Sequence, residues 1–182
     1  MKKPAILTVI FFFFLLITAR AQEFGYKTID AGGEFLGRPH GYSAALHIAY
    51  NFPVHHALNL RVGYNKINSN TDGKHAAEEG SGPGFSLGYR YYFPVRPRGF
   101  FLGIRADVLR LKIAWSQALF EGTSKIWALQ PTAEMGYMIL INDLFFITPF
   151  VSAGVQTNIK TEGQAVGDGF VPQFGLSTGW KF

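Results

Sequence analysis

Hydrophobic and polar residues alternate along most of this chain. In residues 41–52 every second side chain is large and apolar, and the side chains between them are small or polar. The same alternation recurs in residues 57–67, 84–93, 126–139 and 168–182. A period of two over this many positions predicts β-strands, because successive side chains of a strand point to opposite faces. We therefore predict a strand in each of these five stretches.

Three further stretches alternate less regularly: residues 24–35, 100–113 and 144–158. In the second of them the phase changes after Val108, so that Leu109, Leu111 and Ile113 fall on the apolar face. A single slipped residue of this kind predicts a β-bulge. With these stretches the predicted strands number eight.

The links between the predicted strands differ in length on the two sides. The links after the second, fourth and sixth strands are short: residues 53–56, 94–98 and 141–143. The links after the other strands are longer or more polar: residues 37–40, 68–82, 116–123 and 160–169. This asymmetry is typical of outer-membrane barrels, whose short turns face the periplasm.

Three prolines lie inside predicted strands: Pro131, Pro149 and Pro172. A proline cannot donate a hydrogen bond to the ladder, and a closed barrel has no free edge to accommodate it. We expect these residues to mark bulges or to lie near strand ends, and the strand boundaries around them stay open.

The N-terminal residues form a separate unit. Lys2 and Lys3 precede an apolar run over residues 5–17, and the A-x-A sequence at 19–21 follows it. This order predicts a cleaved signal peptide over residues 1–21 and Sec-dependent export of a single mature domain, residues 22–182. An uncleaved anchor helix is the less favoured alternative, since the run is shorter than a membrane-spanning helix requires.

Charge and cysteine content exclude several classes of function. The chain carries a formal net charge of +5, and three of its basic residues lie within the predicted signal peptide, which leaves +2 for the mature domain. We therefore expect no nucleic-acid partner. The sequence contains no cysteine, which excludes disulfides, thiolate metal sites and a cysteine nucleophile.

Alternation alone does not say whether the apolar face points inward, as in a soluble β fold, or toward lipid. Aromatic residues gather near both ends of the strands, as in the interfacial girdles of membrane barrels. The opposite face combines many glycines with charged residues: Asp30, Glu34, Arg61, Arg90, Arg105, Asp107 and Glu134. We predict that these seven form a charge network filling the barrel lumen. An ion-selective pathway is the less favoured alternative, because eight strands leave no room for an open channel.

The chain ends in "GLSTGWKF", with Trp180 and Phe182 on the apolar face. This ending resembles the C-terminal strand that the barrel-assembly machinery reads in bacterial outer-membrane proteins. With the signal peptide and eight strands, the chain resembles the small eight-stranded outer-membrane barrel family of the OmpA and OmpX type, with porin-like β-barrel domains. The resemblance implies an all-β, eight-stranded antiparallel up-and-down transmembrane β-barrel in the cell outer membrane. It also implies contact with outer-membrane lipid and lipopolysaccharide, and we expect a monomer.

Candidate catalytic groups are sparse. Ser43 and His47 share a strand face but lie about 13 Å apart along the strand, too far for a nucleophile–base hydrogen bond. His55 and His56 lie in a predicted turn, and the acidic residues of the loop 68–82 lack the spacing of a calcium loop. We therefore predict no enzyme activity, no cofactor and no metal.

The leading hypothesis is a barrel with a lumen filled by side chains and a structural or surface-interaction role, with an extracellular ligand bound at its loops. One alternative is transport of small hydrophobic molecules through a gap in the wall, suggested by the strand prolines. A lipid A-modifying enzyme is the third hypothesis.

Overall fold

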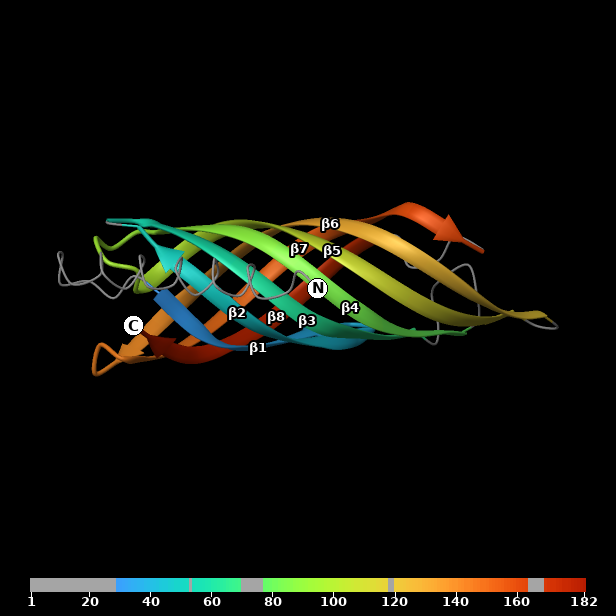
Figure 1. Ribbon diagram of the computed structural model, residues 1–182, viewed down its shortest axis with the longest axis horizontal. Helices are drawn as coiled ribbons and strands as arrows, with labels where there is room; N and C mark the ends of the chain where they lie inside the picture. The colour runs from blue at the N-terminus through green and yellow to red at the C-terminus, as the bar shows by residue number, and fades with distance from the viewer. Residues whose placement is uncertain (1–28, 53, 70–76, 118–119, 164–168) are drawn as a thin grey trace, which may run out of the picture.

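The computed structural model describes residues 29–52, 54–69, 77–117, 120–163 and 169–182. They form eight antiparallel strands: β1 (Ile29–Arg38), β2 (Gly41–Asn51), β3 (His56–Ser69), β4 (Ala77–Tyr92), β5 (Gly99–Gln117), β6 (Phe120–Ile141), β7 (Phe145–Glu162) and β8 (Gly169–Lys181). Each strand pairs with its neighbours in the sequence, and β8 pairs with β1 to close the barrel (Figure 1). The predicted all-β, eight-stranded up-and-down barrel is thus confirmed. The predicted signal peptide lies outside the described residues.

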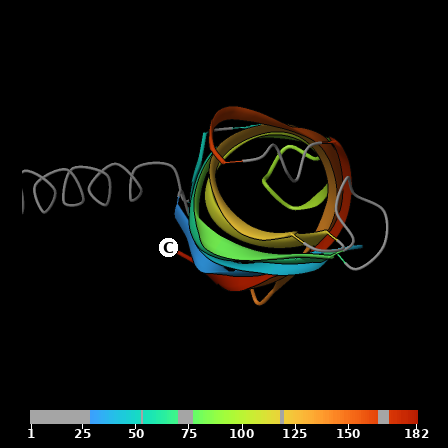
Figure 2. The same ribbon diagram turned by 90° about the vertical axis from the view of Figure 1, so that its right-hand side faces the viewer.

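The two faces of the wall differ as the alternation predicts. Along β2 and β3 the large apolar side chains point outward, and Leu46 and Val62 are 75% and 62% exposed. The alternate side chains are buried in the lumen, including His47 and Arg61. Viewed along its axis, the wall is a closed ring of strands (Figure 2). The hydrophobic face therefore lies on the outside of this barrel, the reverse of a soluble β-sandwich.

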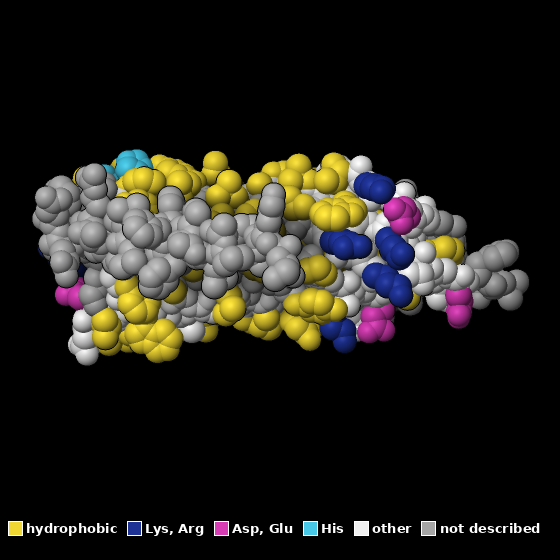
Figure 3. Space-filling model, viewed as in Figure 1, with side chains coloured by type: hydrophobic (Ala, Val, Ile, Leu, Met, Phe, Trp, Pro, Cys, Tyr) yellow, Lys and Arg dark blue, Asp and Glu magenta, His cyan; other side chains and the backbone are white. Residues whose placement is uncertain are grey.

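On the face shown in Figure 3, a band of hydrophobic side chains covers most of the length of the barrel. Lys and Arg side chains gather beyond the end of this band that lies away from the C-terminus. We call that end, where β1–β2, β3–β4, β5–β6 and β7–β8 are linked, the loop side, and the opposite end the turn side. None of the described segments is a helix long and apolar enough to span a membrane.

The predicted bulge in β5 is wrong. β5 pairs with β6 without a register shift from Gly99 to Gln117, and Leu109, Leu111 and Ile113 are buried in the lumen. The sequence pattern changes there because the lumen itself becomes apolar on the loop side, while Arg110 and Lys112 take the outward positions.

The strands also extend further on the loop side than predicted. The link predicted over residues 68–82 is occupied from residue 77 by β4, which pairs with both β3 and β5. Similarly, β6 begins at Phe120, inside the link predicted over residues 116–123. The polar composition that predicts loops here belongs to strands that continue beyond the hydrophobic band.

The strand prolines point outward and coincide with interruptions of the ladders rather than with register shifts. β6 and β7 keep the same register before and after Pro131, and also before and after Pro149, although pairing is missing at both points. The bulge in this seam lies instead at Trp127/Ala128. Pro172 lies near the start of β8, beyond the last pair that β8 forms with β1, so it has β7 as its strand neighbour. The expectation of bulges at Pro131 and Pro149 is therefore wrong.

Two apolar clusters occupy the lumen. The turn-side cluster consists of Leu36, Ala57, Tyr92, Phe101, Met138, Phe146 and Phe150. The loop-side cluster consists of Ile67, Leu109, Leu111, Ile113, Ile126 and Ala128, with Trp115 packed against it. The charged side chains of the lumen are distributed between and around these clusters.

Candidate functional site: the charge network in the lumen

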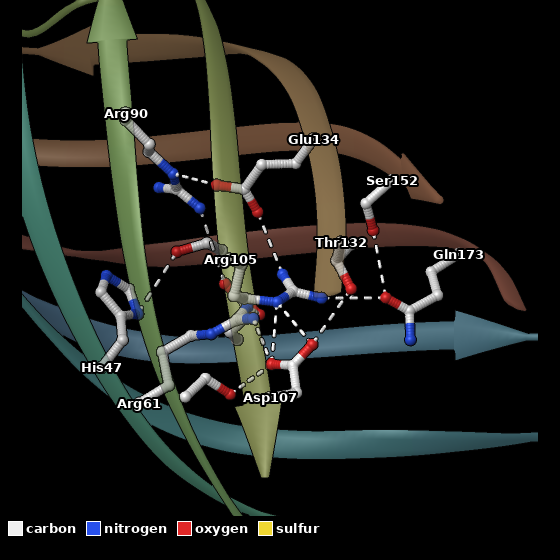
Figure 4. Close-up of polar contacts among 12 residues, drawn as sticks. His47, Arg61, Arg90, Arg105, Asp107, Thr132, Glu134, Ser152 and Gln173 are labelled. Atoms are coloured by element: carbon white, nitrogen blue, oxygen red, sulfur yellow. Dashed lines mark hydrogen bonds and ion pairs between the residues drawn. The ribbon is translucent and has the colours of Figure 1, made fainter. Parts of the chain in front are cut away.

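The lumen holds a connected network of three arginines and three carboxylates, contributed by five strands (Figure 4). Its members are Glu34, Arg61, Arg90, Arg105, Asp107 and Glu134, and all are buried. Since the charges are equal in number, the network is electrically neutral as a unit. We call these six residues the lumen network.

Glu134 on β6 connects two arginines. Its Oε1 accepts a hydrogen bond from Arg90 Nε at 2.7 Å, and its Oε2 accepts one from Arg105 Nη1 at 3.0 Å. Both oxygens of this carboxylate thus accept from charged donors on β4 and β5. Hydrogen bonds between two charged groups are the strongest kind in proteins.

Asp107 on β5 forms the second junction. Its carboxylate accepts a bond from Arg105 Nε at 2.9 Å and from Arg61 Nη2 at 3.3 Å. The hydroxyl of Ser86 also donates to it, and Thr132 Oγ1 donates at 3.3 Å. Each oxygen of this carboxylate thus accepts from one arginine and from a neutral donor: Oδ1 from Arg61 and Ser86, and Oδ2 from Arg105 and Thr132.

Glu34 on β1 closes the network. It forms an ion pair with Arg61 on β3, and its Oε2 lies 3.9 Å from Arg90 Nη2. Arg90 also lies over two aromatic rings of the turn-side cluster, 4.6 Å from the centroid of Phe101 and 5.6 Å from that of Phe150. The network therefore merges into the turn-side cluster through cation–π contacts.

Strand β8 joins the network through Gln173. Arg105 Nη2 donates to Gln173 Oε1 at 2.9 Å, and Ser152 Oγ donates to the same oxygen at 3.1 Å. A buried guanidinium group needs acceptors for its donors. Each of the three nitrogens of Arg105 donates one hydrogen bond, and the acceptors lie on three strands: Asp107 on β5, Glu134 on β6 and Gln173 on β8.

Small residues make room for these long side chains. Gly103 on β5 lies opposite Glu134, and a Cβ at this position would be 2.9 Å from Glu134 Cγ and from the Tyr89 carbonyl oxygen. A side chain here would displace the carboxylate that joins the arginines. The glycines on the polar face of the sequence thus have a packing role in the lumen.

Asp30 lies apart from the other predicted network residues. It pairs with Lys181 on β8 and accepts a hydrogen bond from Asn51 Nδ2 at 2.8 Å. Asp30 and Lys181 are 151 positions apart in the sequence, and this buried ion pair joins the last strand, β8, to the first, β1. The backbones of Ile29 and Phe182 extend the same closure with two hydrogen bonds, of 2.8 and 3.3 Å.

The space left around the network is small. A cavity of about 30 Å³ lies between it and the loop-side cluster, lined by residues that include Arg61, Asp107 and Gln173. One ordered water needs about 10–15 Å³ by this measure, so the cavity has room for about two water molecules. Polar side chains among its lining residues can bind water, and its volume is far too small for a larger solute.

Three residues that sequence reasoning did not assign to the charge network matter here: Lys181, Gln173 and Ser86. All lie on the polar face that the alternation identifies. The partners of Lys181 and Gln173 lie on strands distant in sequence, so only the closure of the barrel and its register identify those contacts. Ser86 lies opposite its partner Asp107 on the neighbouring strand β5, and the register of that pair identifies the contact. Trp180 and Phe182, the predicted assembly signal, point outward at the turn side and are 53% and 62% exposed.

The histidines in the described part of the chain do not form a recognisable catalytic site. Ser43 and His47 are both buried, and no hydrogen bond joins them among the described residues. His47 Nδ1 instead lies 3.5 Å from Ser177 Oγ, at the limit of a hydrogen bond, and both groups are enclosed by the lumen. His55 Nδ1 lies within hydrogen-bond distance of the carbonyl oxygens of Tyr92, the last residue of β4, and of Pro94 in the β4–β5 link. No group of three potential metal ligands occurs in the described part of the chain.

No protein-family model matches the chain, and no curated protein matches its sequence. Among solved structures, the N-terminal β-barrel domain of Pseudomonas aeruginosa OprF superimposes with a TM-score of 0.54 at 15% identity, covering 86% of this chain and 98% of that domain. Ail, the attachment invasion locus protein of Yersinia pestis, superimposes with a TM-score of 0.52 at 12% identity, covering 85% of this chain and 97% of Ail. At these identities the likeness concerns the fold. The chain has the fold of the small eight-stranded outer-membrane β-barrels.

Proposed function

We propose that this protein is a non-enzymatic barrel of the outer membrane whose lumen is sealed and whose loop side serves a structural or surface-interaction role. In this proposal residues 1–21 direct Sec export and are removed, and the barrel-assembly machinery inserts the mature domain through its C-terminal strand. Outer-membrane lipid and lipopolysaccharide then surround the apolar wall. One protein of similar structure, Ail, is an attachment protein, which supports a role at the cell surface.

The observation that carries the proposal is the neutral, buried lumen network. Three arginines and three carboxylates bond to one another across the middle of the barrel, and an apolar cluster packs on either side of them. An ion entering this lumen would have to break charge-assisted bonds, and the small cavity beside the network has too little room for water to replace them. Such an interior supports a filled core and argues against a conducting pathway.

Conductance tests the sealed lumen. The protein, refolded and inserted into planar lipid bilayers, is expected to give no stable stepwise current. Stable steps whose size changes with Arg90→Ala or Arg105→Ala would refute the proposal, because those changes alter only the lumen. Conductance that is the same in all three proteins would point to a contaminating pore, so each preparation is checked with an unfolded sample of equal concentration.

Transport of small hydrophobic molecules is a second candidate, favoured by one observation. The β6–β7 seam lacks pairing at Pro131 and at Pro149 and contains the bulge at Trp127/Ala128. A seam with fewer hydrogen bonds is the place where a wall could open sideways. Uptake of a fluorescent hydrophobic probe by cells with and without the gene tests it, and uptake that requires the gene would favour this candidate over the first.

A further inference from the structure

The outer wall on the loop side carries a group of basic side chains. Arg110 and Lys112 on β5, Lys125 on β6 and Lys160 on β7 are all exposed. We call these four residues the basic patch. The register sets Arg110 opposite Trp127, Lys112 opposite Lys125, and Trp127 opposite Lys160, so the four side chains surround one tryptophan.

The basic patch has more positive charge than the neighbouring carboxylates can balance. Lys112 and Lys125 lie directly opposite each other, an arrangement in which like charges repel. Glu162 faces Lys125 in the register, but its ion pair, of 3.2 Å, is with Lys160. No ion pair joins Arg110, Lys112 or Lys125 to a carboxylate in the described part of the chain. With Glu162 included, these five side chains carry a net charge of +3.

A shallow apolar groove lies on the same strands, nearer the middle of the barrel. Its floor is made of small residues, Ala106, Pro131 and Ala133, and its sides include Leu87 and Ile104. In the register Ala106 lies opposite both Leu87 and Pro131, so the groove runs across β4, β5 and β6. The larger outward side chains around it leave a hollow in an otherwise continuous apolar surface.

The groove and the basic patch form one continuous surface. On β5 and β6 the row Ala106–Pro131 is followed by the row Val108–Leu129 and then by the row Arg110–Trp127. Arg110 lies four positions beyond Ala106, which is about 13 Å along a strand. An amphipathic molecule of lipid size can therefore place an apolar chain in the groove and an anionic group at the basic patch.

We propose that this surface binds one phosphorylated lipid of the surrounding leaflet, with its phosphate on the basic patch and an acyl chain in the groove. The inference rests on the proposed function only in requiring that the loop side meets lipid headgroups, and it gives the lipid partner a specific site. It is independent of whether the lumen conducts.

The chemistry of the residues fits this occupant. The planar guanidinium of Arg110 can donate two parallel hydrogen bonds to a phosphate, and the two opposed lysines supply further positive charge. Trp127 packs against Arg110, whose Cζ lies 5.7 Å from the centre of its ring. A tryptophan is most stable at headgroup depth, which places the basic patch at the level of lipid phosphates.

Lipid binding can be measured by native mass spectrometry of the protein purified in a zwitterionic detergent. The probe is dipalmitoyl phosphatidic acid, and dipalmitoylglycerol is the comparison that lacks the phosphate. We expect one molecule of the phosphatidic acid to bind tightly. The double variant Lys112→Gln/Lys125→Gln should weaken this binding about 30-fold, because each lysine near an anionic lipid accounts for about a fivefold change.

Two control variants make the test specific. Arg96→Gln/Arg98→Gln removes the same charge from exposed positions at the turn side, and it should change the affinity less than about twofold. Ala106→Phe fills the groove and should weaken binding of the dipalmitoyl lipid but not of dihexanoyl phosphatidic acid, whose chains are too short to use it.

Three results would overturn the proposal. One is an equal loss of affinity in the two charge variants, which would show general attraction to a basic protein. Another is displacement of the lipid by inorganic phosphate as readily as by phosphatidic acid, which would show an anion site without an acyl-chain site. The last is a dimer that Ala106→Phe abolishes, which would show that a second copy of the chain covers the groove. Conductance is measured separately, so failure here leaves the sealed lumen unaffected.

Discussion

Replacing Glu134 by glutamine tests how strongly the lumen network stabilises the barrel. The substitution keeps the shape of the side chain but removes the negative charge that Arg90 and Arg105 share, at 2.7 and 3.0 Å. The side-chain amide can accept at one position only, and its NH₂ group would face a guanidinium donor. The network then contains three arginines and two carboxylates, buried together.

The size of the effect follows from these contacts. A hydrogen bond to a charged group contributes about 1.5–3 kcal/mol, and removing one partner of a buried ion pair costs about 3–5 kcal/mol. We expect Glu134→Gln to lower the free energy of unfolding by about 3–5 kcal/mol. With a denaturant slope of about 2 kcal/mol/M, the urea midpoint should fall by about 2 M.

The assay is urea unfolding of the protein refolded in lipid vesicles, followed by tryptophan fluorescence. Glu162→Gln is the matched control, since Glu162 also pairs with a basic residue but its side chain is 59% exposed. Exposed pairs contribute about 1 kcal/mol or less. If Glu134→Gln and Glu162→Gln differ by less than about 1 kcal/mol, bulk water reaches the lumen network and the account of a sealed lumen is wrong.

Three further perturbations give separate predictions. Asp30→Asn should lower the free energy of unfolding by about 3 kcal/mol, because it leaves the buried charge of Lys181 without a partner. Adding Lys181→Gln to the same chain removes that charge, so it should restore part of the lost free energy in the urea assay; no recovery would contradict the ion pair. Gly175→Ala should cost about 1–3 kcal/mol, since its Cβ would lie 2.3 Å from Phe150 Cζ, and an unchanged midpoint would contradict this packing. Phe182→Ala keeps the backbone hydrogen bonds between the last and first strands, so the refolded variant should keep its urea midpoint. In cells it should reduce the amount of the heat-modifiable form in membrane fractions. Equal assembly of the wild-type and variant proteins would contradict the role of Phe182 as an assembly signal.

The outward face and the number of strands could be predicted because they depend on local sequence. The outward-facing apolar alternation runs through most of β2, β3 and β8, and the opposite face already contained the residues of the lumen network. The directions of the side chains after Val108 in β5 could not be predicted correctly in the same way. A change of phase after Val108 indicates either a bulge or a lumen that becomes apolar, and only the neighbouring Ile126 and Ala128 in the closed barrel decide between them.

The partners within the lumen depend on information that the sequence pattern does not contain. Lys181 pairs with Asp30 because β8 closes on β1 in one register, and Gln173 reaches Arg105 across the lumen from a distant strand. The outer ends of β4 and β6 were missed for another reason. Their polar residues lie beyond the hydrophobic band, so the alternation that identifies a membrane strand no longer applies there.

The most direct test of the central claim is the environment of the outward face in a lipid bilayer. The sequence contains no cysteine, so single cysteines at Leu58, Leu60, Val62 and Tyr64 of β3 can each be spin-labelled without background. The account predicts frequent collisions of these labels with oxygen, which concentrates in lipid, and few collisions with a water-soluble nickel complex. Frequent collisions with the nickel complex at Leu60 and Val62 would show that this face meets water and would contradict a transmembrane barrel.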